Sequence, residues 1–328
     1  ATTSAAAPSG GFAWIDENGN ELPDDTEQNW TGASAIWDAV NGSEDGDTIL
    51  VEYGEPGEGP YGFAEVYHYN RVYVDVANLT IKGVDTTGGG NKPHVDKFSI
   101  DAYGVHIDGF EISSADYGVC LMGWTTATHC NISNNDIHNK ADGIHIETGA
   151  HNNTLYGNHI YDNNRGIYAY SANDTTILNN VIHHCGTGIE MGYCDDTTIE
   201  QNDIYDIYDS ETTGINLGFC NHITISHTTI YNISSVGIRA FSCNDTAIEH
   251  CTIYNCSIEG IDMDVCTNTV IEHSEIYEIW AERGPPGDTG ISLYGCDHTV
   301  ISSVTLYDIV TDGIYADSCN DTTIQYCT

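Results

Sequence analysis

Residues 221–243 read NHITISHTTIYNISSVGIRAFSC, and residues 244–266 read NDTAIEHCTIYNCSIEGIDMDVC. Both stretches place an apolar residue at Ile225 or Ile248, a second one five residues later, and then a Gly-Ile pair. Self-similarity at a fixed period of roughly 20–50 residues is the signature of a repeat architecture. The pattern therefore predicts a repeat protein.

The same pattern extends over most of the chain at intervals of 22 to 30 residues. Its first apolar position is occupied by Ile107, Ile132, Leu155, Ile177, Ile199, Ile225, Ile248, Ile271, Ile301 and Ile324. Short alternating pieces such as Gly260-Ile-Asp-Met263 are typical of strands, and no helical period is present. A unit of about 23 residues cannot bury its own apolar face, so the units must stack. We therefore predict an all-β fold: a right-handed, single-stranded parallel β-helix with three sheets.

The N-terminal part has a different pattern. Ser34-Ala-Ile-Trp-Asp-Ala-Val40 predicts a short cap helix, and Gly46-Asp-Thr-Ile-Leu-Val-Glu52 and Asn78-Leu-Thr-Ile-Lys-Gly83 predict strands. This order resembles the opening of the NosD-type and pectate-lyase-like right-handed β-helix families, and the resemblance covers roughly residues 34–328. It implies the fold but not one function, because such folds host lyases, hydrolases, adhesins and structural proteins.

We divide the chain into an N-terminal stub and leading segment (1–33), a cap with the first coils (34–106) and the regular coils (107–328). The first ten residues are small and lack an initiator Met, so we expect a mature end left by signal-peptide removal. Gln325-Tyr-Cys-Thr328 matches Glu249-His-Cys-Thr252, the start of a coil, so we expect the last coil to be incomplete. Together these features predict a secreted, extracellular or cell-surface protein of an archaeon or similar microbe.

The charge excludes several partners. Of the 328 residues, 8 are Lys or Arg and 49 are Asp or Glu, which gives a net charge of −41. Such a chain cannot neutralise a phosphate backbone, and it is not suited to anionic lipid. No stretch approaches the roughly 18 apolar residues that predict a membrane span. The 40% of hydrophobic residues is enough for a core.

One repeat position is a column of cysteines, six residues after the Gly of each Gly-Ile pair. Its members are Cys194, Cys220, Cys243, Cys266, Cys296 and Cys319. Three interpretations stay open: a buried thiol ladder, disulfides between neighbouring coils, and a metal or redox site. The absence of a Cys-x-x-Cys pair disfavours zinc.

A second column is aromatic and is expected to face outward. It contains Tyr161, Tyr205, Tyr231, Tyr254, Tyr277 and Tyr307, with His138 and His183 at equivalent positions. It would be either a stacked ladder that stabilises the sheet or a platform for a sugar chain or a neighbouring copy. A third column, His227, His250 and His273, would be a hydrogen-bonded ladder or a transition-metal site.

Ten Asn-x-Ser/Thr sequons occur, several of them at a turn that the repeat itself favours. We expect glycans at Asn29, Asn41 and Asn78, which lie outside the regular coils. Calcium is the expected cofactor, if any, and the paired carboxylates of Asp195 and Asp196 are its candidate ligands. A solvated acidic turn is the alternative.

The best catalytic candidates are Arg239 with Asp262 and Asp264 in the next coil. This group could hold calcium, position a uronate and abstract a proton; the alternative is an exposed ion pair. Short turns and the net charge argue against a cleft for an acidic polymer. We therefore expect a non-catalytic glycoprotein that associates with copies of itself in a surface layer, sheath, appendage or filament. The alternative is a carbohydrate-active, lyase-like enzyme or a sugar-binding adhesin.

Overall fold

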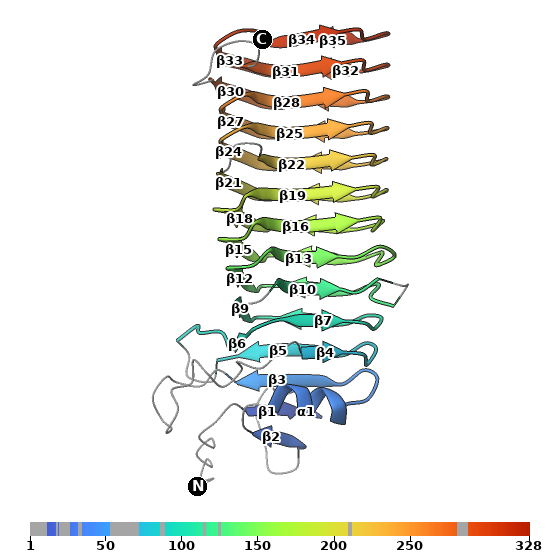
Figure 1. The fold of residues 1–328 in the computed structure, drawn as a ribbon, viewed down its shortest axis with the longest axis vertical. Coiled ribbons are helices and arrows are strands. Elements are labelled where there is room, and N and C mark those ends of the chain that lie inside the picture. Colours follow the sequence, from blue (N-terminus) through green and yellow to red (C-terminus); the bar gives the residue numbers. More distant parts are fainter. Residues whose placement is uncertain are drawn as a thin grey trace.

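The computed structural model describes residues 12–17, 19, 27–31, 35–52, 72–85, 89–113, 116–123, 126–208, 212–280 and 288–328. Three sheets run side by side along the long axis, and each coil contributes one strand to each sheet (Figure 1). From β3 onward every pairing between neighbouring coils in these residues is parallel. The predicted three-sheet parallel β-helix of short strands is therefore confirmed.

Sheet A has 14 strands, in the order β2 (Asn29–Thr31), β1 (Phe12–Ile15), β3 (Thr48–Glu52), β5 (Thr80–Val84), β8 (His106–Asp108), β11 (Asn131–Ser133), β14 (Thr154–Tyr156), β17 (Thr176–Leu178), β20 (Thr198–Glu200), β23 (Thr224–Ser226), β26 (Ala247–Glu249), β29 (Val270–Glu272), β32 (Val300–Ser302) and β35 (Thr323–Gln325).

Sheet B has 11 strands, in the order β4 (Val72–Val74), β7 (Phe98–Ile100), β10 (Tyr117–Leu121), β13 (Asp142–Ile146), β16 (Arg165–Tyr170), β19 (Thr187–Gly192), β22 (Thr213–Gly218), β25 (Val236–Phe241), β28 (Glu259–Asp264), β31 (Thr289–Tyr294) and β34 (Ile314–Asp317). Sheet C has ten strands, in the order β6 (His94–Val95), β9 (Glu111–Ser113), β12 (Asp136–His138), β15 (His159–Tyr161), β18 (Val181–His183), β21 (Asp203–Ile207), β24 (Thr229–Ile233), β27 (Thr252–Cys256), β30 (Glu275–Ile279) and β33 (Thr305–Ile309).

The N-terminal end of the solenoid has its own elements. The helix α1 spans Ala35–Gly42 and buries Ala35, Ile36, Ala39 and Val40. Strand β1 pairs antiparallel with β3, so the first parallel strand has a partner at its N-terminal edge. The predicted helix and both predicted strands are thus present, whereas most of the segment 1–33 and Ser34 lie outside the described residues. No helix in the described part of the chain is long and apolar enough to cross a membrane.

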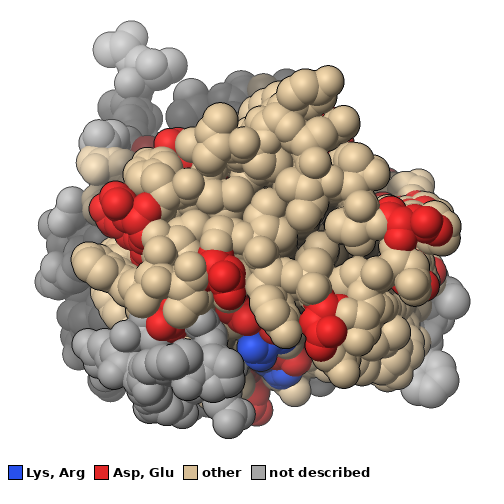
Figure 2. All heavy atoms as spheres, turned by 90° about the horizontal axis from the view of Figure 1, so that it is seen from above, with Lys and Arg blue, Asp and Glu red and all other residues tan. Residues whose placement is uncertain are grey.

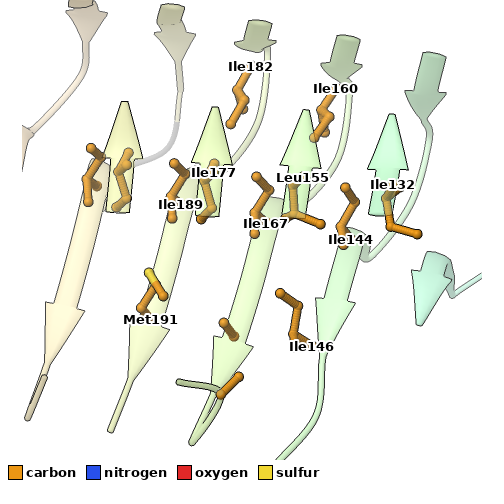
Figure 3. Packing of buried hydrophobic residues seen from close by; sticks show 14 of the residues in the cluster. Ile132, Ile144, Ile146, Leu155, Ile160, Ile167, Ile177, Ile182, Ile189 and Met191 are labelled. Atoms are coloured by element: carbon orange, nitrogen blue, oxygen red, sulfur yellow. The ribbon is translucent and has the colours of Figure 1, made fainter. Parts of the chain in front are cut away.

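The core follows the repeated apolar positions. Ile132 pairs with Leu155, which pairs with Ile177, and each of these side chains is fully buried. Figure 3 shows them directed inward from sheet A, toward Ile160 and Ile182 of sheet C and Ile144 and Ile167 of sheet B. Burying each such side chain stabilises the fold by about 1.5–3 kcal/mol. Because this gain is repeated in every coil, it drives the stacking of the coils.

Two further ladders fix the coil shape. The Gly of each Gly-Ile pair allows close approach: a Cβ on Gly214 would lie 2.6 Å from the Gly237 carbonyl oxygen and 2.7 Å from Ile230 Cγ2. A buried asparagine ladder lies between sheets A and C. There Asn158 donates to Asn180, and Asn180 to Asn202, each through Nδ2 to Oδ1 at 3.0 Å. These bonds satisfy amides that would otherwise be costly to bury.

The surface carries the excess negative charge. Figure 2, which views the solenoid along its axis from the end with β34 and β35, shows acidic side chains around the margin. Basic atoms gather there at one place, beside acidic ones. Positive charge is therefore scarce in this view.

Candidate functional site

Sheet B has a regular outer face. In β13 and β16 a buried Gly-Ile pair separates two polar or aromatic residues, so that Asp142 and His145 flank Gly143-Ile144, and Arg165 and Tyr168 flank Gly166-Ile167. The parallel register places Arg165 beside Asp142 and Tyr168 beside His145. Four side chains from two coils therefore meet on one face.

Asp142 is the centre of this cluster. Its side chain is 1% exposed. The Arg165 guanidinium donates to it through Nε to Oδ1 at 2.6 Å and through Nη2 to Oδ2 at 3.0 Å. His145 Nδ1 lies 2.6 Å from Oδ2 of the same carboxylate. The carboxylate thus orients a base and a cation at once.

Rings and a second carboxylate surround the group. Tyr117 of β10 packs on the His145 ring at 4.4 Å between centroids, and Tyr168 packs on its other side at 5.0 Å. The Arg165 guanidinium carbon lies 3.8 Å from the centre of the Tyr168 ring. Nη1 of Arg165 lies 3.5 Å from Oε2 of Glu190. These contacts hold both polar groups in fixed orientations.

Contacts within the cluster shift the pKa values of Asp142 and Tyr117. Burial opposes ionisation of Asp142, but hydrogen bonds from His145 and Arg165 outweigh it and lower the pKa of Asp142. Burial, with the nearby charge of Asp142, raises the pKa of Tyr117. Asp142 is therefore an anion and Tyr117 a neutral phenol at neutral pH.

The geometry supplies acid–base chemistry. When Nδ1 of a neutral His145 donates to Asp142, the other ring nitrogen, Nε2, is the acceptor. An orienting carboxylate behind an imidazole is the arrangement of a general base. Arg165 still has N–H groups beyond its three contacts, and they can bind an anionic group of a ligand.

The predicted trio lies on the same face, farther along the axis. Arg239 of β25 donates through Nε to Oδ2 of Asp262 in β28 at 3.0 Å, while Asp264 is level with Phe241 rather than with Arg239. The structure thus brings Arg239 and Asp262 together and leaves Asp264 aside. Glu259, which the sequence analysis did not consider, joins them: burial and the charge of Asp262 raise its pKa to about 7.

The predicted metal ligands are placed differently from a chelating site. The rings of His227, His250 and His273 stack at 5.0 and 4.9 Å, so their faces rather than their nitrogens meet. Asp195 Oδ1 accepts the backbone N–H and side-chain amide of Asn221, while Asp196 lies 3.7 Å from His222. Over the described ranges, no group of three or more His, Cys, Asp or Glu is arranged to hold a metal ion. Calcium binding stays a prediction.

The six cysteines of the predicted column stand one above another as free thiols. The Cys194 amide points to Cys220 Sγ at 3.4 Å, and the Cys220 amide to Cys243 Sγ at 3.4 Å. Hydrogen bonds to Cys194 and Cys243, and burial, raise the pKa of the Cys220 thiol. The structure therefore has the arrangement that the first of the three interpretations describes, a buried thiol ladder.

The tyrosine column is a continuous stack on the outer face of sheet C. Tyr231, Tyr254, Tyr277 and Tyr307 follow one another at 4.9, 4.8 and 4.7 Å with nearly parallel rings. Tyr205 and Tyr161 continue the stack through the rings of His183 and His138. Because each ring covers the faces of the next, mainly ring edges are presented to solvent.

The three glycan candidates lie near the N-terminal end. Asn78 Nδ2 donates to Asp45 at 2.7 Å, and Asn41 Nδ2 donates to the Trp37 carbonyl oxygen at 2.7 Å. Asn29 belongs to β2, and its side chain lies outside the described residues. Glycosylation at these positions stays a prediction.

Sequence reasoning missed the cluster around Asp142, although a signal was present. Asp142-Gly-Ile-His145 and Arg165-Gly-Ile-Tyr168 are separated by one coil of 23 residues, the same offset that linked Arg239 to Asp262. A search of this register for every opposite-charge pair would have found Arg165 and Asp142 as well.

The solenoid of three parallel sheets places the chain in the class of parallel β-helix proteins. The family described as "Right handed beta helix region" matches residues 94–210, 166–281 and 213–328. The chain belongs to this family, which confirms the handedness predicted from the repeat. No curated protein matches the chain.

Several solved structures share the fold. The A-module of mannuronan C-5 epimerase AlgE6 from Azotobacter vinelandii is 14% identical, with a TM-score of 0.63 over 89% of this chain and 94% of that one. A GH136 lacto-N-biosidase from Eubacterium ramulus is 16% identical, with a TM-score of 0.61 over 88% and 64%. The Dettilon tailspike protein is 14% identical, with a TM-score of 0.56 over 77% and 56%, so this chain spans about half of that protein.

These comparisons correct one prediction. The expected non-catalytic protein of a surface layer, sheath, appendage or filament is contradicted, because the similar structures are mostly carbohydrate-active enzymes. They favour the carbohydrate-active alternative. The sequence argument relied on the short turns and the net charge, neither of which bears on polar groups that are carried by the strands themselves, such as the Asp142 cluster.

Proposed function

We propose that the outer face of sheet B acts on a glycan that carries uronic acid, by removing the proton from the carbon next to the carboxylate. The observation that carries this proposal is the buried Asp142 carboxylate, bonded both to His145 and to Arg165. A carbon acid of this kind needs a base at the C–H and a positive charge at the carboxylate, where charge develops in the transition state.

Each side chain has a role in the proposed step. Arg165 binds the sugar carboxylate, and His145 Nε2 accepts the proton while Asp142 stabilises the resulting imidazolium. Tyr117, whose pKa is raised, is the neutral O–H within the same group and can donate a proton. Return of a proton to the opposite face of the same carbon gives an epimer; cleavage of the neighbouring C–O bond, with a proton from Tyr117 to the leaving oxygen, gives an unsaturated sugar.

Local charge supports an acidic ligand despite the net charge of −41. Arg165 and Lys97, whose Nζ lies 5.4 Å from the centre of the Tyr117 ring, offset Asp142 and Glu190 on this face. Only 8 basic residues exist in the chain, so two of them here are a notable concentration. A mannuronan C-5 epimerase shares the fold, and its name gives a substrate of the same class. An extracellular location, where such a polymer is met, is part of the proposal.

Proton exchange tests the proposal directly. Polymannuronate or polygalacturonate is incubated with the protein in D2O, and proton NMR follows loss of the C5 signal while absorbance follows unsaturated product. We expect exchange with the wild type and a loss of about 100-fold or more in His145→Ala. His250→Ala, a matched change outside the cluster, should retain the rate. A wild type that gives neither exchange nor unsaturated product with either polymer, or an active His145→Ala, would overturn the proposal.

A second candidate function is glycoside hydrolysis at Glu259 and Asp262. Glu259 has a raised pKa of about 7, while Arg239 pairs with Asp262. A carboxyl group whose pKa lies near neutral pH is suited to act as a general acid. New reducing ends that vanish in Glu259→Gln, with no proton exchange, would favour this candidate.

A further inference from the structure

A second aromatic strip lies at the edge of sheet B, and sequence reasoning did not find it. It consists of Tyr170, Tyr193, Phe219 and Phe241, one from each of four successive coils, with 42%, 49%, 44% and 40% of their surfaces exposed. These values are high for large rings that contact one another. We call the four residues the corner strip.

The rings of the corner strip are not a simple stack. Tyr193 and Phe219 are parallel, with centroids 4.9 Å apart and planes 7° apart. Tyr170 is turned by 65° from Tyr193, and Phe241 by 85° from Phe219. The middle rings therefore cover each other, whereas the two end rings have different orientations.

Two glycines form the floor between the end rings. In the sheet register Tyr170 is level with Gly192, Gly192 with Gly218, and Gly218 with Phe241. A Cβ on Gly192 would lie 3.1 Å from the Tyr170 ring, but a Cβ on Gly218 would meet nothing within 4 Å. The space above Gly218 is therefore open. We call this place, with its flanking rings, the shelf.

Polar side chains flank the shelf on its other side. Glu190 and Asn216 lie two residues before Gly192 and Gly218 in the same strands and are partly exposed. A sugar has an apolar C–H face and a rim of hydroxyl groups, so bare backbone and rings on one side with hydrogen-bonding groups on the other match it.

The shelf is continuous with the Asp142 cluster. Tyr170 belongs to β16, the strand of Arg165, and Glu190, which lies 3.5 Å from Arg165, belongs to β19, the strand of Gly192. The far end of the shelf has Arg239 two residues before Phe241. Arg165 and Arg239 therefore lie in the two strands that bound it.

We propose that the shelf binds the sugar units next to the one held at the Asp142 cluster. The uronic-acid glycan then lies parallel to the solenoid axis, with the bound units extending from Arg165 toward the C-terminal coils. This inference deepens the proposed function, on which its substrate class rests. It assigns Gly218 a role in leaving room for the ligand, and Asn216 and Glu190 the role of hydrogen-bonding partners.

Filling the shelf tests the inference. Gly218→Val places a side chain in open space on a strand, so folding should be retained. Gly313→Val is the matched control, because a Cβ there also meets nothing within 4 Å. Binding of polymannuronate and polygalacturonate is measured by isothermal titration calorimetry. We expect binding about tenfold or more weaker in Gly218→Val, a similar loss in Tyr193→Ala, and wild-type affinity in Gly313→Val.

The outcomes separate the shelf from the reaction. If the wild type binds a polymer and Gly218→Val binds it more weakly, the shelf is supported. If that wild type gives neither proton exchange nor unsaturated product, the proposed reaction is overturned. Exchange with unchanged binding in Gly218→Val supports the reaction and overturns the shelf. No binding of either polymer by the wild type also overturns the shelf, as does a change of oligomeric state in Gly218→Val by analytical ultracentrifugation, which would assign the strip to contacts between copies.

Discussion

The Arg165 guanidinium donates hydrogen bonds to both oxygens of the Asp142 carboxylate, in the preceding coil of sheet B, at 2.6 and 3.0 Å. The same two residues would orient His145 and bind a sugar carboxylate. The pair therefore contributes both to the stability of the coil stack and to the proposed chemistry, and the two contributions can be measured separately.

Removal of this cation should destabilise the fold. Arg165→Ala leaves a carboxylate that is 1% exposed without its main partner, while the Arg165 side chain itself is 33% exposed. We expect a loss of about 2–3 kcal/mol in urea unfolding, between the values for exposed and fully buried pairs. Arg239→Ala, whose partner Asp262 is more exposed, should lose about 1 kcal/mol or less. Equal losses of unfolding free energy in the two variants would contradict the difference in burial between Asp142 and Asp262.

The glycine of the Gly-Ile pair should resist replacement. Gly214→Ala brings a Cβ to 2.6 Å from the Gly237 carbonyl oxygen and 2.7 Å from Ile230, so the neighbouring coils must shift. We expect a loss of about 1–3 kcal/mol in the free energy of unfolding. Gly218→Ala, four residues on in the same strand, meets no atom within 4 Å and should unfold like the wild type. Similar stabilities for the two variants would mean that the coils are not this closely packed.

Glu259 should make stability fall as the pH rises. Burial and the charge of Asp262 raise its pKa from 4.5 to about 7, so between these values the folded state holds a proton that the unfolded state has lost. Stability from this group is thus complete below about pH 4.5 and is lost as the pH rises toward 7. We expect Glu259→Gln to be more stable than the wild type at pH 8 and no more stable at pH 4, by urea unfolding. A constant difference across this range would show that the group titrates normally.

The cysteines should react in two classes. All but Cys319 and Cys327 are buried, and burial raises the pKa of Cys251 to about 11 and that of Cys256 to about 12. Because the thiolate is the reactive form, a thiol reagent should label only Cys319 and Cys327 in the folded protein. In denaturant without reductant all 12 cysteines should react. A count below 12 there would reveal disulfides between coils.

The sequence predicts the fold well because the inward position recurs in every coil. Ile199, Ile225 and Ile248 pair directly, as their spacing implies. The site is harder to predict, since the burial of Asp142 depends on how Tyr117, His145 and Tyr168 pack across three coils, which spacing alone does not determine.

The corner strip shows a second limit of prediction. Tyr170 is level with Gly192, whereas Tyr193 follows that glycine by one residue. Tyr170 and Phe241 therefore share one position of the repeat, whereas Tyr193 and Phe219 share the next, so the four form no single column when the coils are aligned. Their rings meet only because the chain turns a corner there, with Tyr193 and Phe219 in the left-handed region at φ 54° and 56°.

Gly192 and Gly218, the floor of the shelf, lie in strands of regular coils and not in an inserted loop. A duplication of residues 195–220, one coil that carries Gly218 and Phe219, would add one strand spacing of about 4.8 Å between Tyr170 and Phe241. Asp142, His145 and Arg165 would keep their neighbours, since each coil contacts only the next. Under the proposed function, the length of glycan that is bound would therefore change by gain or loss of repeats, while the Asp142 cluster stays unchanged.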